Sequence, residues 1–137
     1  MVARTAPQLT PPAELSVSPE EVPQPVPARQ RTPVDTEAIV RAYFADIPVM
    51  IDIAYCESRF THYLPSGSAL RGHIVPTDIG VMQINEYYHG DAARRLGLDL
   101  HTLEDNLAYA RYLYTRQGTQ PWYPSEHCWR RTLAAGS

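Results

Sequence analysis

The prolines of this 137-residue chain are unevenly distributed, and their distribution limits where a compact fold can form. Eight of the thirteen lie among the first thirty-five residues, in a segment that otherwise consists mostly of Ala, Val, Gln, Glu and Ser. A segment of this composition buries too little apolar surface to offset the entropy of ordering it. We therefore expect residues 1–35 to form a flexible linker or tether, or a frayed terminus, and residues 36–137 to form one folded domain.

Composition and charge exclude several classes of protein. The chain is 44% hydrophobic and 20% charged, which suits one modest core. Its net charge is −3 and all twelve basic residues are arginine, without a basic block, so we expect no nucleic-acid partner. No run of eighteen apolar residues occurs, so we expect no membrane span. The first residues lack the apolar core of a signal peptide, so the sequence predicts no such signal. We also expect a monomer and no cofactor.

Helical periodicity begins directly after the proline-rich segment. Residues 36–47 carry an apolar stripe, with Thr36 as the expected N-cap, and Pro48 ends or kinks this helix. Asp46 is expected to cap a second helix that has Pro48 in its first turn and continues to about residue 59 or 60.

The rest of the domain predicts a small β-segment followed by more helix. Residues 61–85 are punctuated by Gly and Pro, which indicates a β-ribbon with long loops. Helix is expected at about 88–96, and again from Thr102, as N-cap, to Gly118, as the stop signal. The aromatic-rich end is expected to form turns that pack back on the core. The fold class is thus mainly α, with a small β-hairpin segment.

The stretch IAYCESRF, residues 53–60, places a carboxylate where an apolar helix face expects a hydrophobic side chain. At helical spacing Glu57 shares a side with Met50, Ile53 and Ala54. Burial and the negative end of the helix dipole should both raise the pKa of this carboxyl, so that it can act as a general acid. The alternative is a structural acid that satisfies a loop or pairs with an arginine such as Arg59 or Arg71.

Cys56 and Cys128, the two cysteines, lie near the two ends of the folded region. A nucleophilic role for Cys56 is disfavoured, because a helix C-terminus beside a carboxylate does not stabilise a thiolate. Reduced, buried thiols are one possibility. We favour a disulfide, which would fasten the C-terminal segment beside Glu57.

The remaining polar and aromatic residues suit a sugar better than a metal. The five histidines show no metal-ligand spacing, so we expect no metal site and interpret them as surface or loop residues. In GVMQIN, residues 80–85, the amides Gln83 and Asn85 offer both donors and acceptors for sugar hydroxyl and N-acetyl groups. Several tyrosines and tryptophans provide flat surfaces of the kind that line sugar grooves, although some must belong to the core.

Four segments in sequence order resemble a known family. They are CESRF at 56–60, GVMQIN at 80–85, EDNLAYARYLY at 104–114, and the pairs PW and CW near the C-terminus. Together they are similar to the catalytic domain of soluble lytic transglycosylases, in a superfamily that also includes goose-type lysozymes. The likeness covers about residues 37–131.

The resemblance implies a lysozyme-like fold with a groove for peptidoglycan strands of alternating N-acetylglucosamine and N-acetylmuramic acid, and hence action outside the cytoplasm. Glu57 matches the single catalytic acid of the family, and Gly80, Met82 and Gln83 match its Gly-x-Met-Gln motif. The residues expected to contact substrate are Ser58, Gln83, Ile84, Asn85, Asn106, Tyr109, Tyr112, Tyr114 and Trp122.

The chain departs from the family pattern in ways that bear on mechanism. Asp78 and Ile79 stand where many relatives carry small residues. The usual Tyr-Leu pair is reversed as Leu113-Tyr114, which leaves open whether Tyr109, Tyr112 or Tyr114 faces Glu57.

The nucleophile is the other open point. Goose-type lysozymes carry an acid where this chain has Asn85, so the resemblance favours cleavage in which the sugar's own N-acetyl group or 6-hydroxyl acts as nucleophile and yields 1,6-anhydromuramoyl ends. Asp78 and Glu86 are candidate second carboxylates, so a muramidase that hydrolyses the bond is one alternative. The second alternative is a lysozyme-like module that binds glycan but does not cleave it.

Overall fold

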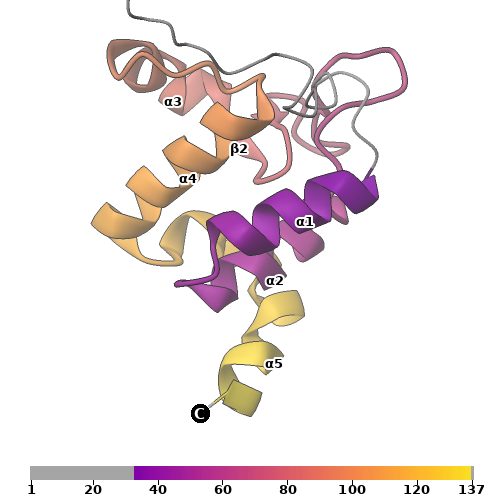
Figure 1. Cartoon of the computed structure of the whole chain (residues 1–137). Coiled ribbons are helices and arrows are strands. Elements are labelled where there is room, and N and C mark those ends of the chain that lie inside the picture. Colours follow the sequence, from indigo (N-terminus) through magenta and orange to yellow (C-terminus); the bar gives the residue numbers. More distant parts are fainter. Residues whose placement is uncertain (1–32, 137) are drawn as a thin grey trace, which may run out of the picture.

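The computed structural model describes residues 33–136, so the expected linker lies almost entirely outside the described residues. In this range the chain is mainly helical, with one small antiparallel sheet (Figure 1). The elements follow in the order α1 (Pro33–Tyr43), α2 (Pro48–Ser58), β1 (Asp78–Ile79), β2 (Ile84–Asn85), α3 (Glu86–Arg95), α4 (Leu103–Gln117), the 3-10 helix η5 (Gln120–Ser125) and α5 (Glu126–Gly136). The expected mainly α fold class is therefore confirmed.

The first two helices differ from the prediction at their N-termini. α1 begins at Pro33, a residue type whose fixed φ suits a first helical turn, so Thr36 lies inside the helix and is buried rather than capping it. α2 begins at Pro48 without a side-chain cap. The Asp46 carboxylate instead accepts two hydrogen bonds from Arg111, at 2.9 and 3.0 Å, and this ion pair ties the α1–α2 corner to α4.

The small sheet consists of two short strands joined by a tight turn. β1 pairs antiparallel with β2, with Asp78 opposite Asn85 and Ile79 opposite Ile84. The turn between them starts at Gly80, whose φ of +76° is one that side-chain-bearing residues rarely adopt. A Cβ there would lie 2.5 Å from Cε1 of His62. The β-segment with long loops is thus confirmed, in a minimal form.

The later helices include one that the sequence predicts accurately and one that it misses. α4 has Thr102 as its N-cap, which accepts a hydrogen bond from the Asp105 N–H, and Gly118 as its C-cap, as expected. α3 begins at Glu86, slightly earlier than predicted, because the side chain of Asn85 caps it. The C-terminal segment is not a series of turns: it forms η5 and then α5.

The core is built around α2. Its Met50 and Ile53 are fully buried, and the helix packs against α1, η5 and α5. A disulfide between Cys56 of α2 and Cys128 of α5, with a Cα–Cα distance of 6.0 Å, confirms the favoured cysteine pairing. In Figure 1, α3 and α5 lie at opposite ends of the molecule. None of the helices in the described range combines the length and the hydropathy needed to cross a membrane.

Candidate functional site

An open cleft of about 520 Å³ lies where α2, the small sheet, α3, α4 and η5 meet. Segments distant in the sequence form its walls, so the fold, rather than any one motif, creates it. Of the residues predicted from the sequence, five line the cleft together: Glu57, Gln83, Ile84, Asn85 and Trp122.

Glu57 occupies the last turn of α2, and the backbone beyond it explains why the helix ends there. Arg59 and Phe60 both have positive φ, of 53° and 61°, a conformation that costs an L residue roughly 1–2 kcal/mol. The Ser58 hydroxyl donates to the carbonyl of Ala54 at 3.0 Å and accepts from the N–H of Thr61 at 3.2 Å, which stabilises the turn. Ser58 therefore acts on the backbone behind the cleft and does not line it.

Burial raises the pKa of the Glu57 carboxyl above its ordinary value. A hydrogen bond from the Ser125 hydroxyl to Oε2, at 2.6 Å, lowers this pKa by stabilising the charged form. The nearby Asp78 carboxylate raises it further, because it repels the charged form. The expected upward shift is confirmed.

Of the two forms of the structural alternative, an ion pair between Glu57 and Arg59 or Arg71 does not occur among the described residues. The Arg59 guanidinium lies 4.6 Å from the ring centroid of Tyr55, and Arg71 binds Glu86 at 2.9 Å. Glu57 is therefore left as a largely buried acid with a hydroxyl partner.

Ser125 is the site residue that the sequence analysis missed. Its Oγ lies within hydrogen-bonding distance of Glu57 Oε2, of the Trp122 carbonyl at 3.1 Å and of the Trp129 indole N–H at 3.1 Å. A signal existed, because Ser125 precedes Cys128 by one helical turn while Cys56 directly precedes Glu57. The favoured disulfide therefore already implied a position for Ser125 close to the acid.

Asn106 lies behind the cleft rather than in it. Its side chain is fully buried, where Oδ1 accepts from the Met82 N–H at 3.0 Å and Nδ2 donates to the carbonyls of Ile79 and Leu100, at 3.0 and 2.9 Å. With both amide hydrogens and the oxygen engaged, the side chain fixes the turn that carries Gln83. The predicted contact with substrate is thus replaced by a supporting role.

His62 lies in a loop, as expected, but its side chain is buried rather than exposed. It is 1% exposed; Nδ1 accepts from the Val81 N–H at 3.0 Å, and Nε2 consequently carries the proton and donates to the His101 carbonyl at 2.9 Å. Burial lowers the pKa of His62 to about 4, so the ring is neutral at physiological pH. It fixes the Gly80 turn from the side opposite the cleft.

Gln83 and Asn85, the two cleft amides predicted from the sequence, differ in how many of their hydrogen-bonding groups the protein already uses. The Asn85 Nδ2 donates to Thr77 Oγ1 and Asp78 Oδ1, at 2.9 and 3.0 Å, while its Oδ1 accepts from the Tyr88 N–H at 3.1 Å. Asn85 therefore caps α3 and orients Asp78. Gln83, whose φ is 51°, donates through Nε2 to the Gly80 carbonyl at 3.0 Å, so its side-chain oxygen is the better group to meet a ligand.

None of the three candidate tyrosines lines the cleft. Leu113 does, and residues 112 and 114 point elsewhere because adjacent helical side chains diverge by about 100°. Tyr109, one turn earlier, is buried, and its hydroxyl reaches only Nδ1 of the cleft residue His89, at 3.1 Å. Ser125 thus supplies the hydroxyl that a tyrosine was expected to place beside Glu57.

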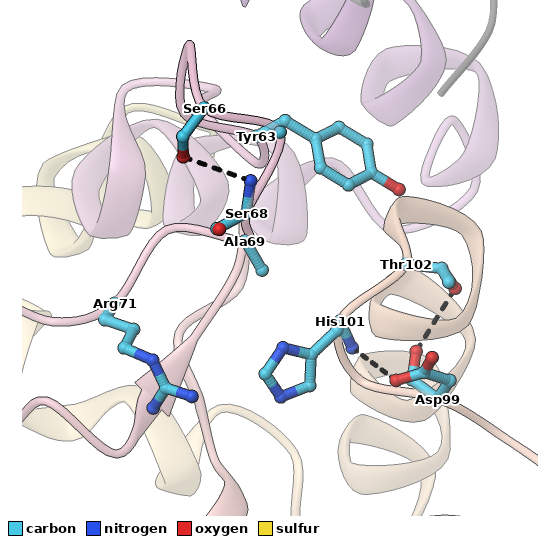
Figure 2. Close-up of a pocket in the computed structure, with 9 residues that line it drawn as sticks. Tyr63, Ser66, Ser68, Ala69, Arg71, Asp99, His101 and Thr102 are labelled. Carbon is cyan, nitrogen blue, oxygen red and sulfur yellow. Dashed lines mark hydrogen bonds between the residues drawn. The ribbon is translucent and has the colours of Figure 1, made fainter. Parts of the chain in front are cut away.

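A second hollow, of about 470 Å³, lies between the loop at 63–71 and the residues preceding α4 (Figure 2). Figure 2 shows Arg71 and His101 on its facing walls. Both bind Glu86, each at 2.9 Å, and the hydrogen bond from His101 together with that from Arg71 lowers the pKa of the Glu86 carboxyl. Glu86 therefore stands apart from the cleft, and of the two candidate second acids only Asp78 lines it.

No protein-family model, curated protein or solved structure matches this chain. Within residues 33–136, no three His, Cys, Asp or Glu side chains are grouped so that they could hold a metal ion. The polar and aromatic groups in or beside the cleft are the Glu57 carboxyl, the Ser125 hydroxyl and the neighbouring amide, carboxylate and aromatic side chains.

Proposed function

We propose that this chain cleaves the β-1,4 bond between N-acetylmuramic acid and N-acetylglucosamine in peptidoglycan, as a lytic transglycosylase with a lysozyme-like fold. The observation that carries the proposal is Glu57, a carboxyl with a raised pKa in the wall of an open cleft. A raised pKa favours the protonated form, so this carboxyl is better suited than an ordinary surface carboxylate to protonate a leaving oxygen.

The reaction needs one residue to act twice. Glu57 donates its proton to the glycosidic oxygen as the bond from that oxygen to C1 of muramic acid breaks, and the electron pair stays on the oxygen. The 6-hydroxyl of the same muramic acid then bonds to C1, directly or after the N-acetyl oxygen has done so, and its proton passes to the Glu57 carboxylate. The products are a free 4-hydroxyl and a 1,6-anhydro ring. Water is not consumed, and Glu57 ends in its starting state.

The remaining cleft residues suit a glycan. Tyr88 and Val75 expose apolar surface along the cleft and the Gln83 amide presents a hydrogen-bonding group, while Trp122 and Leu113, 2% and 3% exposed, are packed into its wall. Sugar rings have apolar faces and polar edges, and sites that bind them combine the same two features. The size of the cleft, about 520 Å³, is in the usual range for a small-ligand site.

A hydrolytic muramidase is the second candidate, and Asp78 is the observation that favours it. This carboxylate lines the same cleft as Glu57, and its charge contributes to the raised pKa of Glu57. An acid so placed could activate a water molecule against C1, which would leave an ordinary reducing end.

The disulfide supports action outside the cytoplasm. Disulfides form and persist in oxidising compartments, and Cys56 is bonded to Cys128 beside the proposed acid. Peptidoglycan lies in such a compartment, so the location of the substrate and the chemistry of the fold agree.

Mass spectrometry of the fragments released from purified peptidoglycan tests the proposal. The intramolecular product is one water lighter than a hydrolysed muramic acid end, and borohydride does not reduce it. We expect this anhydro product to dominate. Reducing muramic acid as the main product would overturn the transglycosylase assignment in favour of Asp78-assisted hydrolysis, and binding without any release of fragments would overturn both.

A further inference from the structure

We infer that Ser125 is a positioning residue that holds the Glu57 side chain in one orientation in both of its protonation states. This inference rests on the proposed function, in which Glu57 alternates between acid and base within one turnover. A carboxyl that must give and then take a proton benefits from a partner that can both donate and accept.

A serine hydroxyl has one hydrogen and two lone pairs, and the surroundings of Ser125 use them in two ways. When Glu57 is ionised, the hydroxyl donates to Oε2 across 2.6 Å. When Glu57 is protonated, the carboxyl can donate to Oγ, and the serine hydrogen can turn to the Trp122 carbonyl at 3.1 Å. Only hydrogens change position between the two arrangements, so the oxygen atoms can stay where they are.

The packing around Ser125 fixes its oxygen. The Trp129 indole N–H lies 3.1 Å from Oγ and 3.2 Å from the Trp122 carbonyl, and Trp129 is 1% exposed. Trp129 directly follows Cys128, which is bonded to the residue that precedes Glu57. The disulfide thus links the backbone next to Glu57 to the backbone next to Trp129, the residue whose indole N–H holds Ser125 Oγ.

No other side chain in residues 35–131 is hydrogen-bonded to the Glu57 carboxyl. The other titratable groups of the cleft are Asp78 on β1 and Tyr88 and His89 on α3. Asp78 repels the ionised form of Glu57. Burial lowers the pKa of His89, which disfavours a positive counter-charge on that ring. Ser125 is therefore the group whose removal should change the behaviour of Glu57 most directly.

Ser125→Ala tests the inference by two independent readouts. The first is the ¹³C-NMR titration of the Glu57 carboxyl in the intact chain without substrate, assigned by comparison with Glu57→Gln. The second is the pH dependence of peptidoglycan cleavage. Since the lost bond favours the ionised form, we expect the pKa of Glu57 to rise further and the alkaline limb of the rate profile to move to higher pH. The maximal rate should fall about tenfold, because the carboxyl is no longer oriented.

Two variants serve as controls. Ser125→Thr retains the hydroxyl and should restore the wild-type pKa of Glu57 and its pH profile. Ser68→Ala removes the same group from an exposed position outside the cleft and should change neither.

An unmoved Glu57 titration in Ser125→Ala, or a loss of rate that is uniform across pH, would overturn the inference and leave Ser125 with a purely structural role. Should Ser125→Ala fail to fold, as judged by circular dichroism, the Thr variant decides, because an altered titration there would equally contradict it. The titration needs no turnover, so a wild-type chain that cleaves nothing would refute the proposed function without deciding the role of Ser125.

Discussion

Glu57 carries the proposed chemistry, and one isosteric substitution isolates its proton. Glu57→Gln keeps the shape of the side chain and an acceptor for Ser125 but cannot transfer a proton. We expect its rate of peptidoglycan cleavage to fall by about 10² or more, the usual scale for loss of a general acid. Glu37→Gln, which neutralises an exposed carboxylate on α1, is the matched control and should retain full activity. Near-wild-type cleavage by the Glu57 variant would remove this residue from the mechanism.

The same substitution should affect stability in a pH-dependent manner. A carboxyl whose pKa is higher in the folded than in the unfolded state contributes stability below its unfolded pKa, and this contribution is lost as pH rises through the folded value. The pKa of Glu57 is raised in the folded state, mainly by burial. Glu57→Gln should therefore raise the melting temperature relative to wild type at pH 8, with a smaller difference at pH 4. A constant offset at all pH values would mean that Glu57 ionises as freely in the folded chain as in the unfolded one.

Residue-level prediction from sequence succeeded where the signal was local and failed where it depended on distant pairing. The inward position of Glu57 follows from helical spacing with Met50 and Ile53 alone. Ser125 lies 68 residues away in sequence, and only the pairing of Cys56 with Cys128 indicates that its hydroxyl lies near an acid. The roles of Asn106 and His62 depend likewise on backbone groups of the Gly80 turn, which no periodicity can indicate.

Among the elements, the hairpin turn depends most on a single residue. Gly80 combines a φ of +76° with contacts that a Cβ would make at 2.5 Å to His62 and 2.6 Å to Asn106. Gly97 has the same φ, but nothing lies within 4 Å of its would-be Cβ. Gly97→Ala should cost about 1–2 kcal/mol of unfolding free energy, for backbone strain alone. Gly80→Ala should cost about 1–3 kcal/mol more, for overpacking. Urea denaturation of both variants measures the difference. Equal losses of unfolding free energy would show that the side chains of His62 and Asn106 can move aside.

The disulfide between α2 and α5 should be a major source of stability. It joins residues separated by 72 positions, and closing a loop of that length stabilises a fold by ~4 kcal/mol in the chain-entropy model. The variant Cys56→Ala with Cys128→Ala should therefore unfold at a markedly lower urea concentration than the oxidised wild type. A reducing agent should lower the wild-type midpoint and leave the variant unchanged. If the wild type and the double variant, each with and without reducing agent, had the same midpoint, packing alone would hold α5 in place.

Helices that carry their own caps could be predicted, and helices that depend on the rest of the fold could not. α4 has Thr102 before it, an apolar stripe within it and Gly118 after it, so local rules predict both its existence and its limits. Among the described side chains of α5 only Trp129 is fully buried, which gives no periodic stripe to recognise. This helix is held by the disulfide and by packing on α2 and η5.

At the scale of the whole molecule, the sequence predicted the fold class because the main determinants were compositional. Within residues 33–136, alternation between helical stripes and Gly-Pro punctuation indicated helices around a small β-segment. The cleft could be anticipated only in part. Its walls come from five parts of the fold, and helix packing decides which side chains of each part point into the cleft. Leu113 rather than a tyrosine faces the cleft for this reason.

The position of the disulfide has a consequence for the covalent continuity of the cleft. Every residue that lines the cleft lies between Cys56 and Cys128 in the sequence, so the entire cleft belongs to one covalently closed ring. A single peptide-bond break at an exposed point of that ring, such as residues 64–66, would leave both pieces joined. A protease must cut the ring twice to detach any part of the cleft.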